Sequence, residues 1–171
     1  MKIAFAPAVA LLLAVGTALA AGQKAAPSLD PRYAELDFWL GEWDVFDASG
    51  RQVGENSIRK ELKGRLVLES WRDAAGGEGK GMHFFDPARG HWKLVWVDDR
   101  GGVKEKTGGP AGDAAMRVEG EVTYPGGTRA LDRTTLTRLP DGKVRQVIEW
   151  SADAGRTWKT SFDATYVRKK G

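Results

Sequence analysis

The stretch Phe38-Trp39-Leu40-Gly41-Glu42-Trp43-Asp44-Val45 decides how the rest of the chain is interpreted. It contains two tryptophans on either side of Gly41, and glycine is a residue at which helices commonly end. We predict that a short helix ends at Gly41 and that the first β-strand begins directly after it. We also expect Trp39 and Trp43 to close one end of a β-barrel.

The residues before Gly41 support the helical part of this interpretation. Asp30-Pro31 is typical of a helix start, because an Asp side chain caps free backbone N–H groups and Pro suits the first helical position. Leu36, Trp39 and Leu40 recur at spacings that share one helical face. The segment therefore predicts a short helix with one apolar side.

After residue 45 the sequence consists of short alternating segments separated by turns rich in Gly, Pro and Asp, such as 86–90 and 140–142. This spacing is typical of antiparallel barrels and sandwiches, and no later stretch has a helical period. We predict an all-β fold: a single antiparallel up-and-down β-barrel of about 8–10 strands with a short N-terminal helix. The expected strands are 43–46, 52–62, 66–71, 81–85, 92–97, 103–107, 116–122, 129–139, 144–150 and 158–167.

Alternation within these strands predicts which side chains face the interior. Trp92, Leu94 and Trp96 share one side of their strand, and the faces of the last two strands, including Trp158, are mostly apolar. Gln146, Thr160 and Tyr166 interrupt these apolar faces, and a buried polar group without a partner costs about 1–3 kcal/mol. Either these polar groups bond to each other in a solid core, or they line a cavity. The cavity interpretation predicts these ligand-binding residues: Met82, Phe84, Trp92, Trp96, Gln146, Trp150, Thr160, Phe162 and Tyr166.

The first twenty residues have the features of a secretory signal peptide. Lys2 is followed by an apolar run rich in Ala, Leu and Val, and Ala18-Leu19-Ala20 has the small-residue spacing of a cleavage site. We predict a signal peptide over 1–20, a flexible tether over 21–29 and the barrel domain over 30–171, in the periplasm or outside the cell. The apolar run is short for a membrane span, so we expect none after cleavage. The chain has no Cys, hence no disulfide.

The charge balance argues against a nucleic-acid partner. Of the 26 basic residues only Lys2 lies in 1–20, which leaves 25 basic against 23 acidic side chains in the rest of the chain. The pI is near 9.2, but charges of both signs are interspersed and the only basic run is 168–170. We therefore predict a solvated surface without a nucleic-acid site. The sequence leaves the oligomeric state open.

Several motifs together resemble a known family. Gly41-Glu42-Trp43 with Arg168 near the C-terminus resembles the lipocalin/calycin arrangement, in which a terminal-strand Arg lies over the strand-one Trp. With Phe85-Asp86-Pro87, Trp96-Val97-Asp98 and the segment 151–158, the pattern over 37–168 looks like the DUF1579-type, lipocalin-like family of uncharacterised exported bacterial proteins. The resemblance implies a calycin-like barrel. It implies no particular activity, because none is established for that family.

The segment Ser151-Ala152-Asp153-Ala154-Gly155-Arg156-Thr157-Trp158 matches the Asp-box pattern. Asp can cap backbone amides within the turn, Gly adopts positive φ, and Trp anchors the returning strand. Asp boxes elsewhere recur on propeller blades, but a single copy does not predict a propeller. We expect a structural hairpin here.

The two histidines give little support for a metal or haem site. Haem barrels of the nitrobindin type place a proximal His on a late strand, whereas 161–166 contains none. His91 is expected to face solvent, and His83 could face either way. A zinc site needs a cluster of Cys, His or carboxylate ligands that the spacing does not provide. We predict no metal and no cofactor, and keep a haem-binding barrel as a minor alternative.

Catalysis is not indicated either. The chain has no Gly-x-Ser-x-Gly elbow and no Cys nucleophile. Glu69 and Glu149 lie mid-strand and are interpreted as ion-pair partners of Arg133 and Arg145, and we assign no catalytic residue. The leading hypothesis is an exported barrel that binds a small hydrophobic or amphipathic molecule. The alternative is a packed barrel that acts as a protein-interaction module in the cell envelope, with strand 52–62 as an edge available for pairing.

Overall fold

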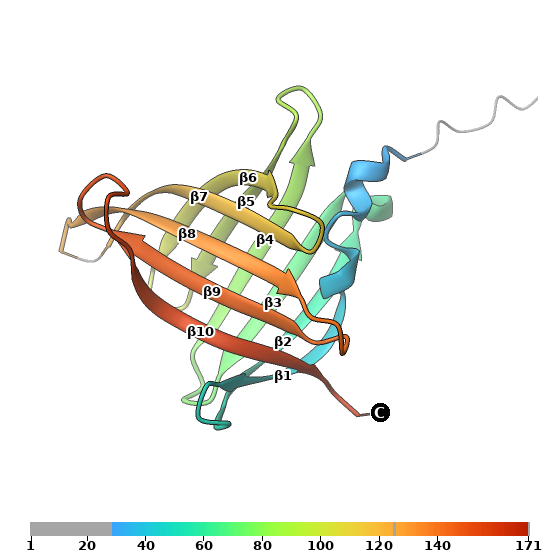
Figure 1. The fold of residues 1–171 in the computed structure, drawn as a ribbon, viewed down its shortest axis with the longest axis horizontal. Coiled ribbons are helices and arrows are strands. Elements are labelled where there is room, and N and C mark those ends of the chain that lie inside the picture. Colours follow the sequence, from blue (N-terminus) through green and yellow to red (C-terminus); the bar gives the residue numbers. More distant parts are fainter. Residues whose placement is uncertain (1–28, 125, 171) are drawn as a thin grey trace, which may run out of the picture.

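The computed structural model describes residues 29–124 and 126–170, which form a closed antiparallel barrel (Figure 1). Each strand pairs with its neighbours in sequence, and the first pairs with the last, so the predicted up-and-down barrel is confirmed. The strands are β1 (Gly41–Asp47), β2 (Gln52–Glu61), β3 (Leu66–Asp73), β4 (Glu78–Asp86), β5 (His91–Asp98), β6 (Val103–Pro110), β7 (Ala115–Thr123), β8 (Arg129–Arg138), β9 (Val144–Ser151) and β10 (Lys159–Arg168).

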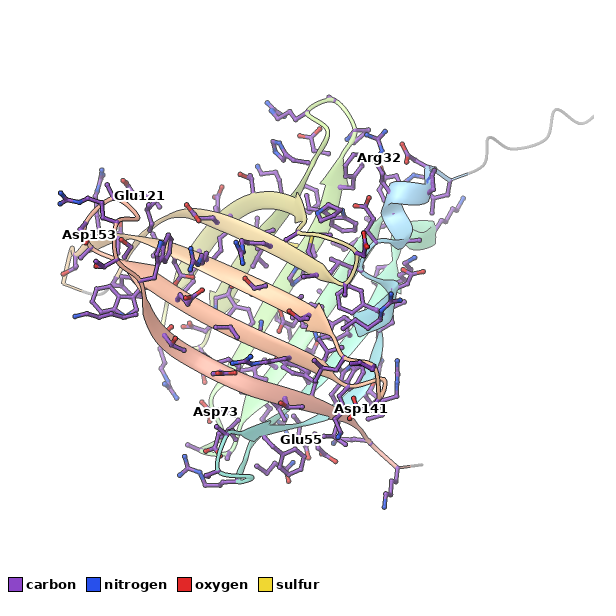
Figure 2. The ribbon with its side chains drawn as sticks, in the orientation of Figure 1. Arg32, Glu55, Asp73, Glu121, Asp141 and Asp153 are labelled. Atoms are coloured by element: carbon purple, nitrogen blue, oxygen red, sulfur yellow. The ribbon has the colours of Figure 1, made fainter. Side chains whose placement is uncertain are left out.

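The barrel has two different ends. Strand direction alternates, so the turns after β1, β3, β5, β7 and β9 meet at one end, which we term the open end. The other turns and the helices before β1 lie at the opposite end, which we term the plug end (Figure 1). Figure 2 shows Asp153 and Asp141 at the two ends of β9, Asp153 at the open end.

The predicted helix is present as two short 3-10 helices, η1 (Pro31–Ala34) and η2 (Asp37–Trp39). Asp30 caps η1 as expected, because its Oδ1 accepts a hydrogen bond from the backbone N–H of Arg32 at 3.0 Å. The Trp43 indole donates to the backbone oxygen of Trp39 at 2.8 Å, which ties the helices to β1. Trp39 and Trp43 are fully buried, and they close this end of the barrel as predicted.

The main hydrophobic core lies behind these tryptophans, in the plug half of the barrel. Trp39 packs edge-on against His83 and Tyr166, and Trp43 packs against the same tyrosine. Apolar side chains from the strands complete the core: Val45, Ile58, Val67, Phe85, Trp92, Leu94, Met116, Val118, Leu136, Val144 and Ala164.

A short 3-10 helix, η3 (Leu62–Gly64), joins β2 to β3. The prediction that strand 52–62 is a free edge is wrong. β2 is hydrogen-bonded to β1 on one side and to β3 on the other, because closure of the barrel uses both of its edges.

The Asp-box segment forms the hairpin between β9 and β10, as expected. The Asp153 carboxylate accepts hydrogen bonds from the backbone N–H of Thr157 at 2.8 Å and from its hydroxyl at 2.7 Å. Trp158, which the sequence predicts as an inward-facing strand residue, precedes β10 and does not face the interior. Its ring lies 3.9 Å from the guanidinium of Arg133 on the outside of β8, so it anchors the hairpin there.

The predicted signal peptide, 1–20, and most of the tether, 21–29, lie outside the described residues. Leu29, the last tether residue, is described and packs against the hydrophobic core. None of the helices in the described ranges has the length and apolar character needed to cross a membrane.

Candidate functional site

A partly enclosed cavity of about 190 Å³ lies between the hydrophobic core and the open end. It has apolar walls near the open end and a polar floor near the middle of the barrel. Its lining residues come from six strands: Glu69 and Trp71 on β3, Leu94, Trp96 and Asp98 on β5, Lys104 and Lys106 on β6, Thr134 on β8, Gln146 and Ile148 on β9, and Phe162 and Tyr166 on β10.

Two tryptophan rings form the apolar walls, and glycines make room for them. A Cβ on Gly54 would lie 2.4 Å from the Trp71 ring, and one on Gly79 would lie 2.1 Å from the Trp96 ring. Each ring therefore occupies the space that a side chain at the glycine would fill. Phe162 meets Trp71 edge-on with ring centroids 6.0 Å apart. The result is an aromatic entrance to the cavity.

Glu69 forms part of the floor and is almost completely buried. Its Oε1 accepts a hydrogen bond from Asn56 at 2.7 Å, and its Oε2 lies 3.1 Å from His83 Nε2. The Asn56 amide also donates to the Tyr166 hydroxyl at 3.3 Å, while its own carbonyl oxygen is buried without a partner among the described residues. An incompletely satisfied polar network is costly, so core stability alone does not explain it.

Tyr166 links this network to Gln146. Its hydroxyl donates to the Gln146 side-chain oxygen at 2.6 Å, which leaves the Gln146 amide nitrogen with no hydrogen bond to the described residues. Burial raises the pKa of Tyr166 well above its usual value, so the hydroxyl stays protonated as a donor. The Gln146 amide is therefore a hydrogen-bond donor available to a cavity occupant.

Lys106 is the second polar element of the floor. Its ammonium donates to Asp132 Oδ1 and to Thr134 Oγ1, the latter at 2.7 Å. Asp132 Oδ2 accepts from Lys104 at 2.8 Å and from the Tyr124 hydroxyl at 2.7 Å. One buried carboxylate is thus shared by two ammonium groups that line the cavity.

Burial and charge shift the pKa values of this cluster in opposite directions. Burial lowers the pKa of Lys106 to about 8, even though the negative charge of Asp132 works to raise it. Burial also acts to raise the pKa of Asp132, but Lys106 and Lys104 outweigh it and hold that pKa below the usual range. Burial and the Asp132 hydrogen bond raise the pKa of Tyr124. The carboxylate is therefore charged at neutral pH, and Lys106 is easier to deprotonate than an ordinary lysine.

The structure brings four of the nine predicted site residues together in the cavity: Trp96, Gln146, Phe162 and Tyr166. Trp92 faces inward as expected but lies deeper, in the hydrophobic core. Its indole donates a 2.7 Å hydrogen bond to Glu35 next to η1, so it fastens the plug and does not line the cavity.

Met82 and Phe84 face outward, so their predicted place in the interior is wrong. Met82 is 41% exposed, whereas its neighbours Gly81 and His83 are buried. The predicted alternation of β4 is therefore one residue out of register with the structure. The inner set is instead Gly79, Gly81, His83 and Phe85. Its two glycines leave the space that Trp96 and Glu69 occupy beside them.

Thr160 also lies on the outside, and Trp150 lies beyond the cavity. The register between β10 and β9 shifts between Thr160 and Phe162, so Ser161 forms a bulge and the alternation changes face. Trp150 is half-buried at the open end, where the Lys159 ammonium lies 5.2 Å from its ring centre. Neither side chain is among those that line the cavity.

Sequence reasoning missed Trp71, Lys104, Lys106 and Thr134 and misassigned Glu69. The expected ion pair between Glu149 and Arg133 is present at 2.7 Å, but Glu69 contacts no arginine and faces the cavity. The position of Glu69 between Val67 and Trp71 in β3 was the available signal, because alternation places all three on one face.

No group of three or more His, Cys, Asp or Glu side chains in residues 29–124 and 126–170 is arranged to hold a metal ion. No family model matches this chain, and no curated protein matches it.

Proposed function

We propose that this chain binds a small amphipathic molecule in the cavity at the open end. The observation that carries the proposal is the combination, in one cavity, of aromatic walls with a polar floor that has unused donors. The indole rings of Trp71 and Trp96 offer the apolar contact, and the Gln146 amide offers a directional hydrogen bond. Concave sites with apolar walls and few convergent polar groups are the usual form of ligand pockets.

The cavity volume sets the size of the ligand. An apolar cavity of about 150 Å³ accommodates benzene, whereas pockets for drug-sized ligands measure about 300–1,000 Å³. At about 190 Å³ the buried part of the ligand corresponds to one aromatic ring with a short chain, or to an aliphatic chain of similar bulk. We favour such a ligand over haem for this reason. In addition, His83 lies below the cavity, in contact with Glu69 and Trp39.

The alternative of an interaction module loses its structural basis in the form predicted from the sequence. That hypothesis relied on β2 as a free edge, and both edges of β2 are hydrogen-bonded within the barrel. The export and the DUF1579-type membership predicted from the sequence remain part of the proposal. A closed up-and-down barrel is the fold that this resemblance implies.

Tryptophan fluorescence tests the proposal. Hydrocinnamyl alcohol, which carries one ring and a short chain, should change the emission of the wild-type protein in a saturable way. The double variant Trp71→Phe, Trp96→Phe should lose most of that change, because it removes the two indoles of the cavity wall. The control variant Trp158→Phe, altered on the outer surface, should retain it. Flat titrations with aryl and alkyl alcohols, or an unchanged signal in the double variant, would contradict binding in this cavity.

A further inference from the structure

Lys106 is a buried amine at the floor of the cavity. Its side chain is only 1% exposed, and two of its three ammonium hydrogens are donated to Asp132 and Thr134. The third has no acceptor among the described residues, although the side chain lines the cavity. An isolated buried ion pair contributes little to stability compared with apolar packing, so the fold itself does not require a lysine here.

The charges around Lys106 favour an uncharged ligand head group. Asp132 on β8, Glu69 on β3 and Lys104 on β6 are the charged groups that face Lys106. Two ammonium groups and two carboxylates cancel formally, and Asp98 at the rim adds a further negative charge. A carboxylate ligand would meet no net positive field in the cavity. A neutral carbonyl group, in contrast, could accept hydrogen bonds from the free donors.

We propose that Lys106 forms an imine with a small aldehyde whose apolar part occupies the cavity between Trp71 and Trp96. This inference rests on the proposed function, because it requires that the cavity admits a small amphipathic molecule. It adds the chemical class of the ligand and the atom that captures it, Lys106 Nζ.

The reaction is balanced without an oxidant or a reductant. The neutral amine attacks the carbonyl carbon, a C–N bond forms, and the carbonyl π electrons move to the oxygen, which takes up a proton. That proton replaces one hydrogen lost by the amine nitrogen. The resulting hydroxyl then gains a second proton, equivalent to the other amine hydrogen, and leaves as water while the nitrogen lone pair forms the C=N bond. The Thr134 hydroxyl lies 2.7 Å from Nζ, and its own hydrogen is directed to no described acceptor, so it can donate to the departing oxygen.

Two features of the site favour this chemistry. Burial lowers the pKa of Lys106 to about 8, so about a tenth of the molecules carry a neutral amine at pH 7. An ordinary lysine is neutral in less than about 0.1% of molecules at that pH. The protonated imine carries the same charge as the ammonium it replaces, so Asp132 remains its counter-ion, and desolvated lysines are established amine nucleophiles.

Reductive trapping tests the proposal. The wild-type protein is incubated at pH 7 with hydrocinnamaldehyde and cyanoborohydride, and the modified lysines are mapped by peptide mass spectrometry. We expect a mass increase equal to the aldehyde less one oxygen atom, and labelling of Lys106 at least about tenfold faster than that of the exposed Lys63. An excess of hydrocinnamyl alcohol, which cannot form an imine, should suppress labelling at Lys106 only.

The outcomes separate this inference from the proposed function. Lys106→Arg, which keeps the charge beside Asp132, should abolish the fast labelling. Lys80→Arg, altered at an exposed position of β4 away from the cavity, should preserve it. If hydrocinnamyl alcohol binds while Lys106 is labelled no faster than Lys63, the imine is excluded and the binding function stands. If the alcohol does not bind and Lys106 is not labelled, both fail. Peptide mapping of the labelled wild-type protein tests imine formation at Lys106 even if a variant does not fold.

Discussion

The guanidinium of Arg168 lies over the ring of Trp43, with its central carbon 4.4 Å from the ring centroid. The two residues are register partners where β10 closes onto β1, and Arg168 Nη1 also donates to the backbone oxygen of Leu40 at 3.0 Å. A Cβ on Gly41 would lie 2.4 Å from the same nitrogen, and Gly41 has a φ of 135°. The arginine thus lies where the plug, the first strand and the last strand meet.

Arg168→Ala should destabilise the protein by about 1 kcal/mol, because it removes a cation–π contact from the closure of the barrel. Urea unfolding measures the change. Lys170→Ala, two residues further along the tail, should leave the midpoint within the error of the measurement. Equal midpoints for Arg168→Ala and the wild type would show that the contact is not energetically significant.

Glu35→Ala should cost about 1–3 kcal/mol of unfolding free energy, because it leaves the buried indole N–H of Trp92 without an acceptor. Glu35→Gln keeps a side-chain oxygen in the same place and should be close to the wild type. Thermal and urea unfolding of the pair provide the measurement. Equal unfolding free energies for Glu35→Ala and Glu35→Gln would mean that this hydrogen bond does not stabilise the plug.

Gly79→Ala should weaken binding of hydrocinnamyl alcohol by at least about tenfold, or about 1.4 kcal/mol, because the new Cβ displaces the Trp96 ring from the cavity wall. Gly109→Ala is the matched control on β6, since no atom lies within 4 Å of its added Cβ. Circular dichroism checks that both variants are folded. Unchanged affinity in folded Gly79→Ala would indicate that the ring position is not part of the site.

The lowered pKa of Lys106 predicts that stability rises with pH above about 8. Between the folded-state pKa of about 8 and the usual value of 10.5, the unfolded chain binds more protons at this site than the folded protein does. The free energy of unfolding then increases with pH, by at most about 1.4 kcal/mol per unit for one proton. The raised pKa values of Tyr124 and Tyr166 act in the opposite direction above pH 10, so the window is pH 8–10.

The test is to measure the unfolding free energy of the wild type and of Lys106→Met by urea denaturation at several pH values between 8 and 10. The variant lacks the titrating amine, so its unfolding free energy should rise less steeply with pH than that of the wild type. Parallel slopes would show that Lys106 does not titrate with a lowered pKa in the folded protein.

The strand count, the plug and the Asp-box hairpin could be predicted because each depends on local chemistry. The cap at Asp30, the turn at Gly155 and the aromatic stretch around Gly41 act within a few residues of each other. Which side chains of β4 point into the barrel could not be predicted in this way. Its inner positions include Gly79 and Gly81, and only the packing of Trp96 and Glu69 from neighbouring strands explains why they are small.

The candidate site was only partly predictable for the same reason. Trp96, Gln146 and Tyr166 followed from alternation, whereas the bulge at Ser161 moved Thr160 to the outer face without a Gly or Pro to mark it. Lys106 is the clearest case of a residue that the sequence does not single out. A lysine in a strand normally indicates a solvent-exposed face, and its carboxylate partner Asp132 lies two strands away.

The amino-acid sequence alone determined that the chain would form a curled antiparallel sheet capped by Trp39 and Trp43. Backbone preference and alternation are properties of neighbouring residues, and they are the same wherever the strands later meet. Tertiary structure decided what the interior holds: closure of β10 onto β1 placed Glu69, Lys106 and Tyr166 around one cavity. The physical reason is that burial, pairing of charges and available volume depend on residues that are distant in sequence and adjacent only after the barrel closes.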